Sequence, residues 1–137
     1  HYLPRMDWID STRVFVQQLN RLQNQVTVYS VDVTNAKIDI LLTEKDDAWI
    51  DVQETIHWLE DRTHFIWLSE RSGWRHIYLV STESKSVQPI TMGEFDVIDV
   101  LGVDEKSKSV YFYASPTNAT QMYLYRIKID GSELQRV

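Results

Sequence analysis

The chain contains no cysteine. This absence excludes a disulfide framework, a zinc site built on thiolates and a cysteine nucleophile. It leaves the redox compartment open, because proteins of oxidising compartments can also lack cysteine.

Positive charge is also scarce. The sequence holds 14 Lys and Arg against 20 Asp and Glu, which gives a net charge of −6. Proteins that bind nucleic acid need clustered cations to displace counterions, so this composition argues against a nucleic-acid partner. No apolar run approaches the roughly eighteen residues that span a bilayer, and the first residues contain no signal-peptide core. We expect no membrane insertion.

Glycine is rare, and its four positions are isolated from one another at Gly73, Gly93, Gly102 and Gly131. A serine nucleophile elbow needs the pattern Gly-x-Ser-x-Gly, and a phosphate-binding loop needs closely spaced glycines. Neither pattern occurs. The sequence therefore predicts no catalytic residue and no nucleotide or other cofactor.

Aromatic and aliphatic residues, in contrast, are plentiful. Hydrophobic residues make up 43% of the chain, which includes five Trp, seven Tyr and four Phe. This composition supports one folded unit with a real core, and aromatic residues are enriched in packed β-sheet. The composition favours an all-β fold.

Two series of apolar segments repeat along the chain with one period. The first series consists of residues 14–16, 65–67 and 111–113, spaced by 51 and 46 residues. The second series places Tyr29, Tyr78 and Tyr123 in corresponding positions. Each unit opens with one more short segment (6–9, 56–59, 97–103) and closes with another (37–42, 87–92, 133–137). Four strands per unit result.

Four strands in a period of 40 to 50 residues are typical of a β-propeller blade. We therefore predict three consecutive four-stranded antiparallel blades, at about residues 5–54, 55–96 and 97–137, which form a partial and open propeller. Residues 65–68 and 110–114 are apolar at successive positions, as expected for strands covered on both faces. Polar turn formers occupy 60–63, 71–73, 104–109 and 130–132.

One segment permits a second interpretation. Residues 11–24 can also be drawn as a capped amphipathic helix with Val14, Phe15, Leu19 and Leu22 on one side. The phase of the repeat instead places a strand, a turn and a strand there. We prefer the strands.

The segment 67–79, Trp-Leu-Ser-Glu-Arg-Ser-Gly-Trp-Arg-His-Ile-Tyr-Leu, resembles the propeller of the dipeptidyl peptidase IV family of serine exopeptidases. Weaker segments at 19–24, 49–51 and 91–97 follow that family's order, so the resemblance covers almost the whole chain. The residues that carry the motif are Trp67, Glu70, Arg71, Gly73, Trp74, His76 and Tyr78. The resemblance implies that they form two blade strands and the hairpin between them.

The resemblance also implies a larger parent protein. In that family an eight-bladed propeller covers an α/β-hydrolase domain with a Ser-His-Asp triad, and N-terminal dipeptides are released after proline or alanine. The hydrolase domain and the paired glutamates that hold the substrate amino terminus are not in this sequence. We expect a non-catalytic piece that gates and shapes the substrate pocket, with the hydrolase domain and peptide substrates as partners. A stand-alone propeller scaffold and the propeller of a related oligopeptidase are the alternatives.

Two residues are candidates for substrate contact. Trp49 and Asp51 lie in the link between the first and second blades, and by family analogy this loop approaches the substrate. Packing of Trp49 between blades is the competing interpretation. For Glu70, Arg71 and Arg75 we prefer a set of salt bridges that orders the hairpin over a substrate or inter-domain contact.

The four histidines do not have the spacing of a metal site, so we expect no metal. We expect His76 to support its blade through a hydrogen bond to a loop carbonyl. An open set of blades exposes apolar faces at both ends, so self-association is expected. The lack of cysteine inclines us to an extracytoplasmic location, in the bacterial periplasm or envelope.

Overall fold

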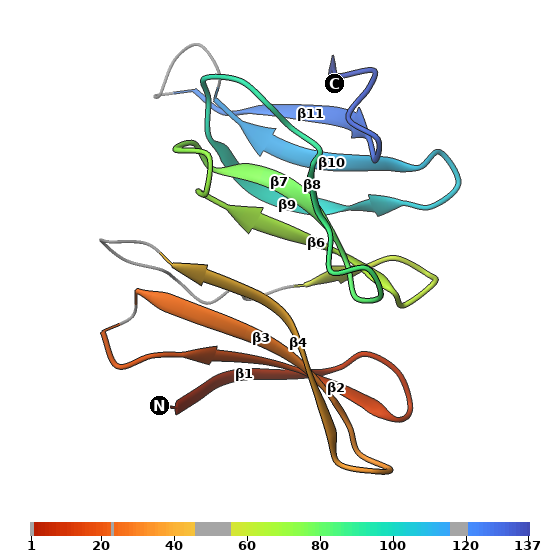
Figure 1. The fold of residues 1–137 in the computed structure, drawn as a ribbon. Coiled ribbons are helices and arrows are strands. Elements are labelled where there is room, and N and C mark those ends of the chain that lie inside the picture. The colour runs from red at the N-terminus through yellow and green to blue at the C-terminus, as the bar shows by residue number, and fades with distance from the viewer. Residues whose placement is uncertain (1, 23, 46–55, 116–120) are drawn as a thin grey trace. The chain divides into compact units, whose positions relative to one another are not determined.

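The computed structural model describes residues 2–22, 24–45, 56–115 and 121–137 (Figure 1). The regular elements of these residues are all β-strands. In chain order they are β1 (Tyr2–Trp8), β2 (Arg13–Leu19), β3 (Gln25–Asp32), β4 (Lys37–Lys45), β5 (His57–Trp58), β6 (His64–Ser69), β7 (His76–Ser81), β8 (Val87–Pro89), β9 (Val97–Asp104), β10 (Ser109–Ala114), β11 (Tyr123–Lys128) and β12 (Gln135–Arg136). The chain divides into two compact units, His1–Thr55 and Ile56–Val137.

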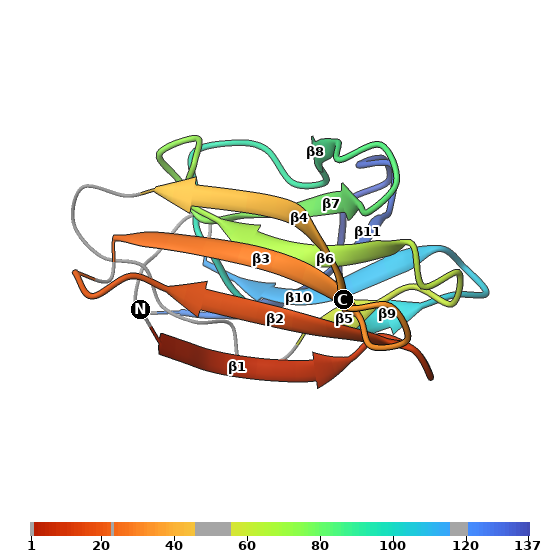
Figure 2. The ribbon, with the colours of Figure 1, turned by 60° about the horizontal axis from the view of Figure 1, so that its bottom comes forward.

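The first unit is one antiparallel sheet in the order β1-β2-β3-β4 (Figure 2). Its strand β2 occupies the segment for which a helix was the alternative, so the interpretation from the repeat is confirmed there. Val14, Phe15, Val16, Gln17 and Leu19 of this strand are all buried. Burial on both faces explains why the apolar pattern of β2 does not alternate as it does in a half-exposed strand.

The second unit contains two four-stranded sheets, β5-β6-β7-β8 and β9-β10-β11-β12. All strand pairs in both sheets are antiparallel. The predicted all-β fold, with three four-stranded antiparallel sheets, is confirmed. The positions of the blade boundaries remain a prediction.

One backbone hydrogen bond recurs in all three sheets and relates them residue by residue. It joins Val33 N to Thr12 O (2.8 Å), Thr82 N to Thr63 O (2.7 Å) and Ile129 N to Lys108 O (2.8 Å). In each sheet this bond lies at the open end of the hairpin formed by the second and third strands, away from the connection that joins them. We call it the anchor bond, and equivalent positions are counted from it.

Counting from the anchor bond corrects two predictions. The segments 14–16 and 65–67 hold the second to fourth strand pairs, but 111–113 holds the third to fifth, so the equivalent segment of the third sheet is 110–112 when counted from the anchor bond. The fourth strand pair after it is Val16–Tyr29 in the first sheet, Trp67–Tyr78 in the second and Phe112–Tyr125 in the third. Tyr29 and Tyr78 therefore correspond, but Tyr125 replaces Tyr123, which pairs with Ala114. Tyr123 and Tyr125 are two residues apart and share a face, so strand periodicity could not distinguish them.

The two faces of each sheet can now be named. The leading face carries the second and fourth strand pairs after the anchor bond, and the trailing face carries the third and fifth. The leading faces present Val14, Val16, Tyr29 and Val31 in the first sheet, Phe65, Trp67, Tyr78 and Val80 in the second, and Val110, Phe112, Tyr125 and Ile127 in the third.

The core of the second unit lies between its two sheets. Ile66 and Ile77, from the trailing face of the second sheet, form one buried cluster with Val110, Phe112 and Ile127 from the leading face of the third. Phe112 is fully buried. Neighbouring sheets of this unit thus pack trailing face against leading face.

Candidate functional site at the hairpin and crossing of the second unit

Trp49 and Asp51, the residues predicted to lie near substrate, fall in 46–55, outside the described residues. Their proposed role stays a prediction. The family-like motif of 67–79 lies within the described residues and can be built up from its strands.

Trp67 and Tyr78 form the structural centre of this motif. They pair across β6 and β7 and are 1% and 6% exposed. Trp67 also meets Phe65 edge to face, with 6.2 Å between ring centroids. The guanidinium carbon of Arg71 lies 5.6 Å from the centroid of the Tyr78 ring, within the range of a cation–π interaction. The strand residues of the motif are therefore core residues.

The hairpin 70–75 is shaped by hydrogen bonds that its backbone N–H groups donate. Gly73 N donates to Glu70 O at 2.9 Å, and Arg71 N donates to Ser69 Oγ at 3.1 Å. Gly73 has φ +95°, a conformation that other residues rarely adopt, although a Cβ there would meet no atom within 4 Å. Position 73 therefore requires glycine because of its positive φ, and not because a larger side chain would clash with its neighbours.

Ion pairs within the described residues lie away from this hairpin. They join Arg13 to Asp10, His64 to Asp61 and Lys108 to Glu105. The salt-bridge set preferred from the sequence therefore does not include an ion pair of Glu70 with another described residue. Turn geometry and the stacking of Arg71 on Tyr78 contribute to the order of the hairpin.

His76 connects the hairpin to the chain that crosses from the second sheet to the third, residues 90–96. Its ring is 3% exposed, with Nδ1 2.8 Å from Thr91 Oγ1 and Nε2 2.8 Å from Gly93 O. A carbonyl oxygen only accepts, so we assign the proton to Nε2. The hydrogen bond to a loop carbonyl expected for His76 is present.

The remaining ring nitrogen extends this network. Ile77 N donates to Thr91 Oγ1 at 3.0 Å, which leaves the Thr91 hydroxyl proton free to be donated to His76 Nδ1. The chain of donors runs from Ile77 through Thr91 and His76 to Gly93. With the proton on Nε2, both ring nitrogens of His76 have a hydrogen-bond partner in this chain. We call these four residues the His76 relay.

Further contacts fix the crossing against the hairpin. Arg75 N donates to Asp96 Oδ1 at 2.7 Å, and Val97 N donates to Arg75 O at 2.7 Å. The Phe95 ring meets the His76 ring edge to face at 5.0 Å. Gly93, with φ +128°, passes so close to Phe95 that a Cβ would lie 3.1 Å from its ring. Hairpin and crossing therefore form one ordered end of the unit.

Large side chains project from this ordered end. Trp74 is 41% exposed and Met92 is 75% exposed. Charged side chains are exposed around them: Glu70, Arg71, Arg75, Glu94 and Asp96. An aromatic ring and a thioether within a charged rim suit the binding of another protein surface or a peptide.

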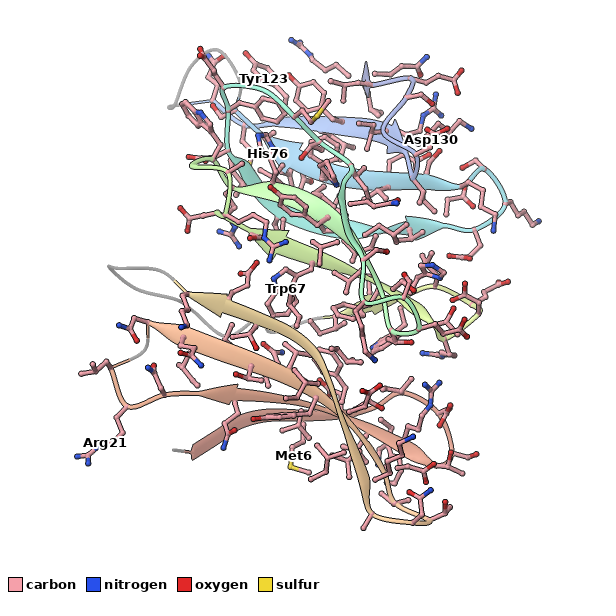
Figure 3. All side chains as sticks on the ribbon, viewed as in Figure 1. Met6, Arg21, Trp67, His76, Tyr123 and Asp130 are labelled. Carbon is pink, nitrogen blue, oxygen red and sulfur yellow. The ribbon has the colours of Figure 1, made fainter. Side chains whose placement is uncertain are left out.

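Figure 3 shows where this end lies in the second unit. His76 and Tyr123 are near one end of the strands, and Asp130 is near the other. The sequence had singled out 91–97 for its resemblance but not as the partner of His76. The pairing of this segment with His76 could have been suspected from Gly93. An isolated glycine two residues after Thr91 indicates a turn, and a turn exposes a backbone carbonyl that a histidine can reach.

Among the residues with described positions, no group of three or more His, Asp or Glu is arranged to hold a metal ion. That part of the chain also includes no helix with the length and apolar character to span a bilayer.

The whole chain, residues 1–137, matches the family described as "Dipeptidyl peptidase IV (DPP IV) N-terminal region". The dipeptidyl peptidase 4 proteins of Trichophyton equinum and Trichophyton rubrum are each 29% identical over 130 residues, covering 90% of this chain and 17% of their own. The chain thus spans about a sixth of the length of these relatives.

A solved structure gives the same result for the fold. The crystal structure of Porphyromonas gingivalis dipeptidyl peptidase 4 is similar to this chain with a TM-score of 0.87 and 25% identity. The similarity covers 98% of this chain and 19% of that protein.

Proposed function

Since this chain belongs to the dipeptidyl peptidase IV N-terminal region family, we propose that it is a non-catalytic propeller segment of a serine exopeptidase that removes N-terminal X-Pro or X-Ala dipeptides. Its role is to gate and shape the substrate pocket. The hairpin 70–75 and the crossing 90–96 are the surface that faces the pocket or the hydrolase domain.

The observation that carries this proposal is the pairing of a rigid base with exposed contact residues. The His76 relay and the Asp96–Arg75 contact hold the backbone in place, while Trp74 and Met92 project outward. Large apolar side chains on a fixed backbone lose little entropy when they bind. Trp49 and Asp51 belong to the preceding link between sheets and remain candidates for substrate contact.

The proposal is tested in the full-length parent enzyme. Trp74→Ala and Met92→Ala should lower kcat/KM for a Gly-Pro chromogenic substrate by about tenfold, because removing one large contact costs on the order of 1–2 kcal/mol. Leu134→Ala is the matched control, since Leu134 is 49% exposed and precedes Gln135, which pairs with Arg126 and not with the Tyr123 end of β11. Unchanged kinetics in both test variants would remove this surface from the substrate path.

Two further results would decide the role of the chain itself. Residues 1–137 alone should show no turnover of the same substrate, and measurable hydrolysis would contradict a non-catalytic role. A parent reading frame without a downstream Gly-x-Ser-x-Gly elbow would favour a stand-alone scaffold.

The proposed location is the bacterial periplasm or envelope. The similarity to the dipeptidyl peptidase 4 of Porphyromonas gingivalis motivates the bacterial part of this proposal. A cleavable leader at the start of the parent reading frame would support the location, and cytosolic fractionation of the parent protein would contradict it.

A further inference from the structure

The crossing from the second sheet to the third is attached to the core of its unit on both sides of one exposed residue. Ile90 is 2% exposed, belongs to the buried cluster of the unit and donates from its backbone N to Ile77 O at 2.8 Å. Phe95 packs against the same cluster. Met92 lies between these two attachments and is 75% exposed. The crossing therefore presents Met92 on a backbone that is held to the core before it and after it.

His76 contacts both residues that flank Met92. Its Nδ1 lies 2.8 Å from Thr91 Oγ1, and its Nε2 lies 2.8 Å from Gly93 O. Thr91 directly precedes Met92 and Gly93 directly follows it. One buried ring thus holds the chain on either side of the exposed side chain, and this fixes the point at which that side chain leaves the backbone.

The packing around Gly93 leaves the crossing little room to shift. Gly93 has φ +128°, and a Cβ at this position would lie 3.1 Å from the Phe95 ring. The Phe95 ring meets the His76 ring edge to face, with 5.0 Å between centroids. A displacement of the crossing by about 1 Å away from the His76 ring would break the hydrogen bond to Gly93 O, because such bonds extend to only about 3.2 Å.

The side chain of Met92 suits contact with an apolar partner. A methionine is unbranched and polarizable, so it adapts to partners of different shape. A fixed backbone beneath it reduces the entropy that is lost when the contact forms. Met92 on the ordered crossing combines both properties, because the side chain can adapt while its attachment point stays in place.

We propose that His76 is a positioning residue for the exopeptidase reaction and that it acts through Met92. The inference rests on the proposed function, in which this end of the unit faces the substrate pocket. His76 is 3% exposed and touches no substrate itself; it holds Met92 against an apolar part of the bound substrate. This contact is made away from the scissile bond, so it is equally strong in the ground state and in the transition state. Its loss therefore raises KM and leaves kcat unchanged.

The test is a double-mutant cycle on the kinetics of the full-length parent enzyme with a Gly-Pro chromogenic substrate. His76→Phe should raise KM by up to about tenfold with kcat unchanged, since it can lose no more than the contact that it positions. In a Met92→Ala background, the same change should raise KM by less than about twofold.

Two results of the cycle would contradict the proposal in different ways. An equal effect of His76→Phe in both backgrounds would overturn the positioning role and leave the proposed surface intact. Wild-type kinetics in Met92→Ala would also overturn it, and if Trp74→Ala were unchanged as well, the proposed function of this surface would fail with it.

Control variants separate position from stability. Val80 is fully buried near the other end of β7, so Val80→Ala should destabilise the same strand without a change in KM. His76→Gln keeps an N–H that can donate to Gly93 O, and its KM should stay within about threefold of that of the unmodified enzyme. If either control raised KM as much as His76→Phe does, the effect would not come from the position of Met92 and the proposal would be wrong.

Hydrogen exchange gives a readout that does not depend on turnover. In the full-length enzyme, His76→Phe should speed amide exchange in peptides that cover residues 90–97 and leave exchange in β10 as it is, because only the crossing loses its attachment. Unchanged exchange across 90–97 would mean that His76 does not hold the crossing, and the proposal would fall.

Discussion

At the scale of single residues, the His76 relay couples two segments that are separate in sequence. Thr91→Val keeps the shape of the side chain but removes its hydroxyl. That hydroxyl accepts a hydrogen bond from Ile77 N and donates one to His76 Nδ1. His76→Phe leaves Gly93 O without its donor. Each change should lower the free energy of unfolding by about 1–3 kcal/mol, the usual cost of leaving a buried polar group unsatisfied.

The double variant distinguishes a network from two separate contacts. Urea unfolding of both single variants and of the double variant gives a mutant cycle. The combined loss should be smaller than the sum of the single losses, because either change breaks the same chain of donors. Strict additivity would contradict the relay, and Glu94→Gln, on the exposed part of the crossing, is the control.

The sequence predicted part of this arrangement. A histidine in an apolar strand needs hydrogen-bond partners, and that alone indicated a loop carbonyl for His76. The identity of the partners could not be predicted, because Thr91 and Gly93 approach only when the crossing folds back along the hairpin. Trp49 and Asp51 were chosen as candidates for substrate contact from their residue types and their place in the link between the first and second blades. Neither property predicts where their side chains lie.

At the scale of structural elements, aspartates recur in the turns that join the first and second strands or the third and fourth strands. The pKa of Asp10 is lowered to about 2, first by the backbone N–H of Thr12 and then by the side chain of Arg13. The hydroxyl and then the backbone N–H of Thr34 lower the pKa of Asp32, and those of Ser132 lower the pKa of Asp130.

These lowered pKa values predict acid sensitivity of the turns. A carboxylate whose folded pKa lies below its unfolded value stabilises the fold above the unfolded pKa, and this stabilisation is lost as the pH falls through the folded pKa. Stability should therefore decline from about pH 4 to pH 2. Asp10→Asn should cost about 1 kcal/mol or less at pH 7, allowing for solvent screening, and should flatten this decline.

Urea midpoints across the pH range check the prediction. Glu83→Gln, which changes an exposed carboxylate in a turn of the second sheet, should leave the slope as it is. A decline of equal steepness in Asp10→Asn would assign the acid sensitivity to other groups.

Strand identity was predictable at this scale, whereas strand register was not. Apolar runs at a common period located twelve strands, because propensity and burial favour the same segments. Register depends on turn lengths and bulges, and the third sheet has a register shift between Tyr111 and Phe112. The choice of Tyr123 instead of Tyr125 was wrong because both satisfy a period of two.

At the scale of the whole molecule, stability of the second unit depends on the core between its two sheets. Phe112 is fully buried there and stacks on Tyr125 with ring centroids 5.7 Å apart. Phe112→Ala should lower the free energy of unfolding by about 3–5 kcal/mol, through lost burial and the cavity left behind. Leu101→Ala, at a 49% exposed position of the same sheet, should cost far less.

Chemical denaturation monitored by circular dichroism measures both variants. Equal losses in the two would contradict a core that lies between the second and third sheets. The division into three four-stranded sheets was predictable from the repeat. The packing of the two sheets of the second unit follows from their composition, because sheets that are apolar on both faces must be covered on both.

The anchor bond has a consequence for how such a protein can change over time. It fixes one end of each hairpin, while the opposite ends close at Leu19–Val26, Ser69–His76 and Ala114–Tyr123 around connections 20–25, 70–75 and 115–122. Residues gained or lost in these connections leave the anchored end in register. Insertions or deletions can therefore accumulate in these connections, one hairpin at a time, without redesign of the scaffold beneath them.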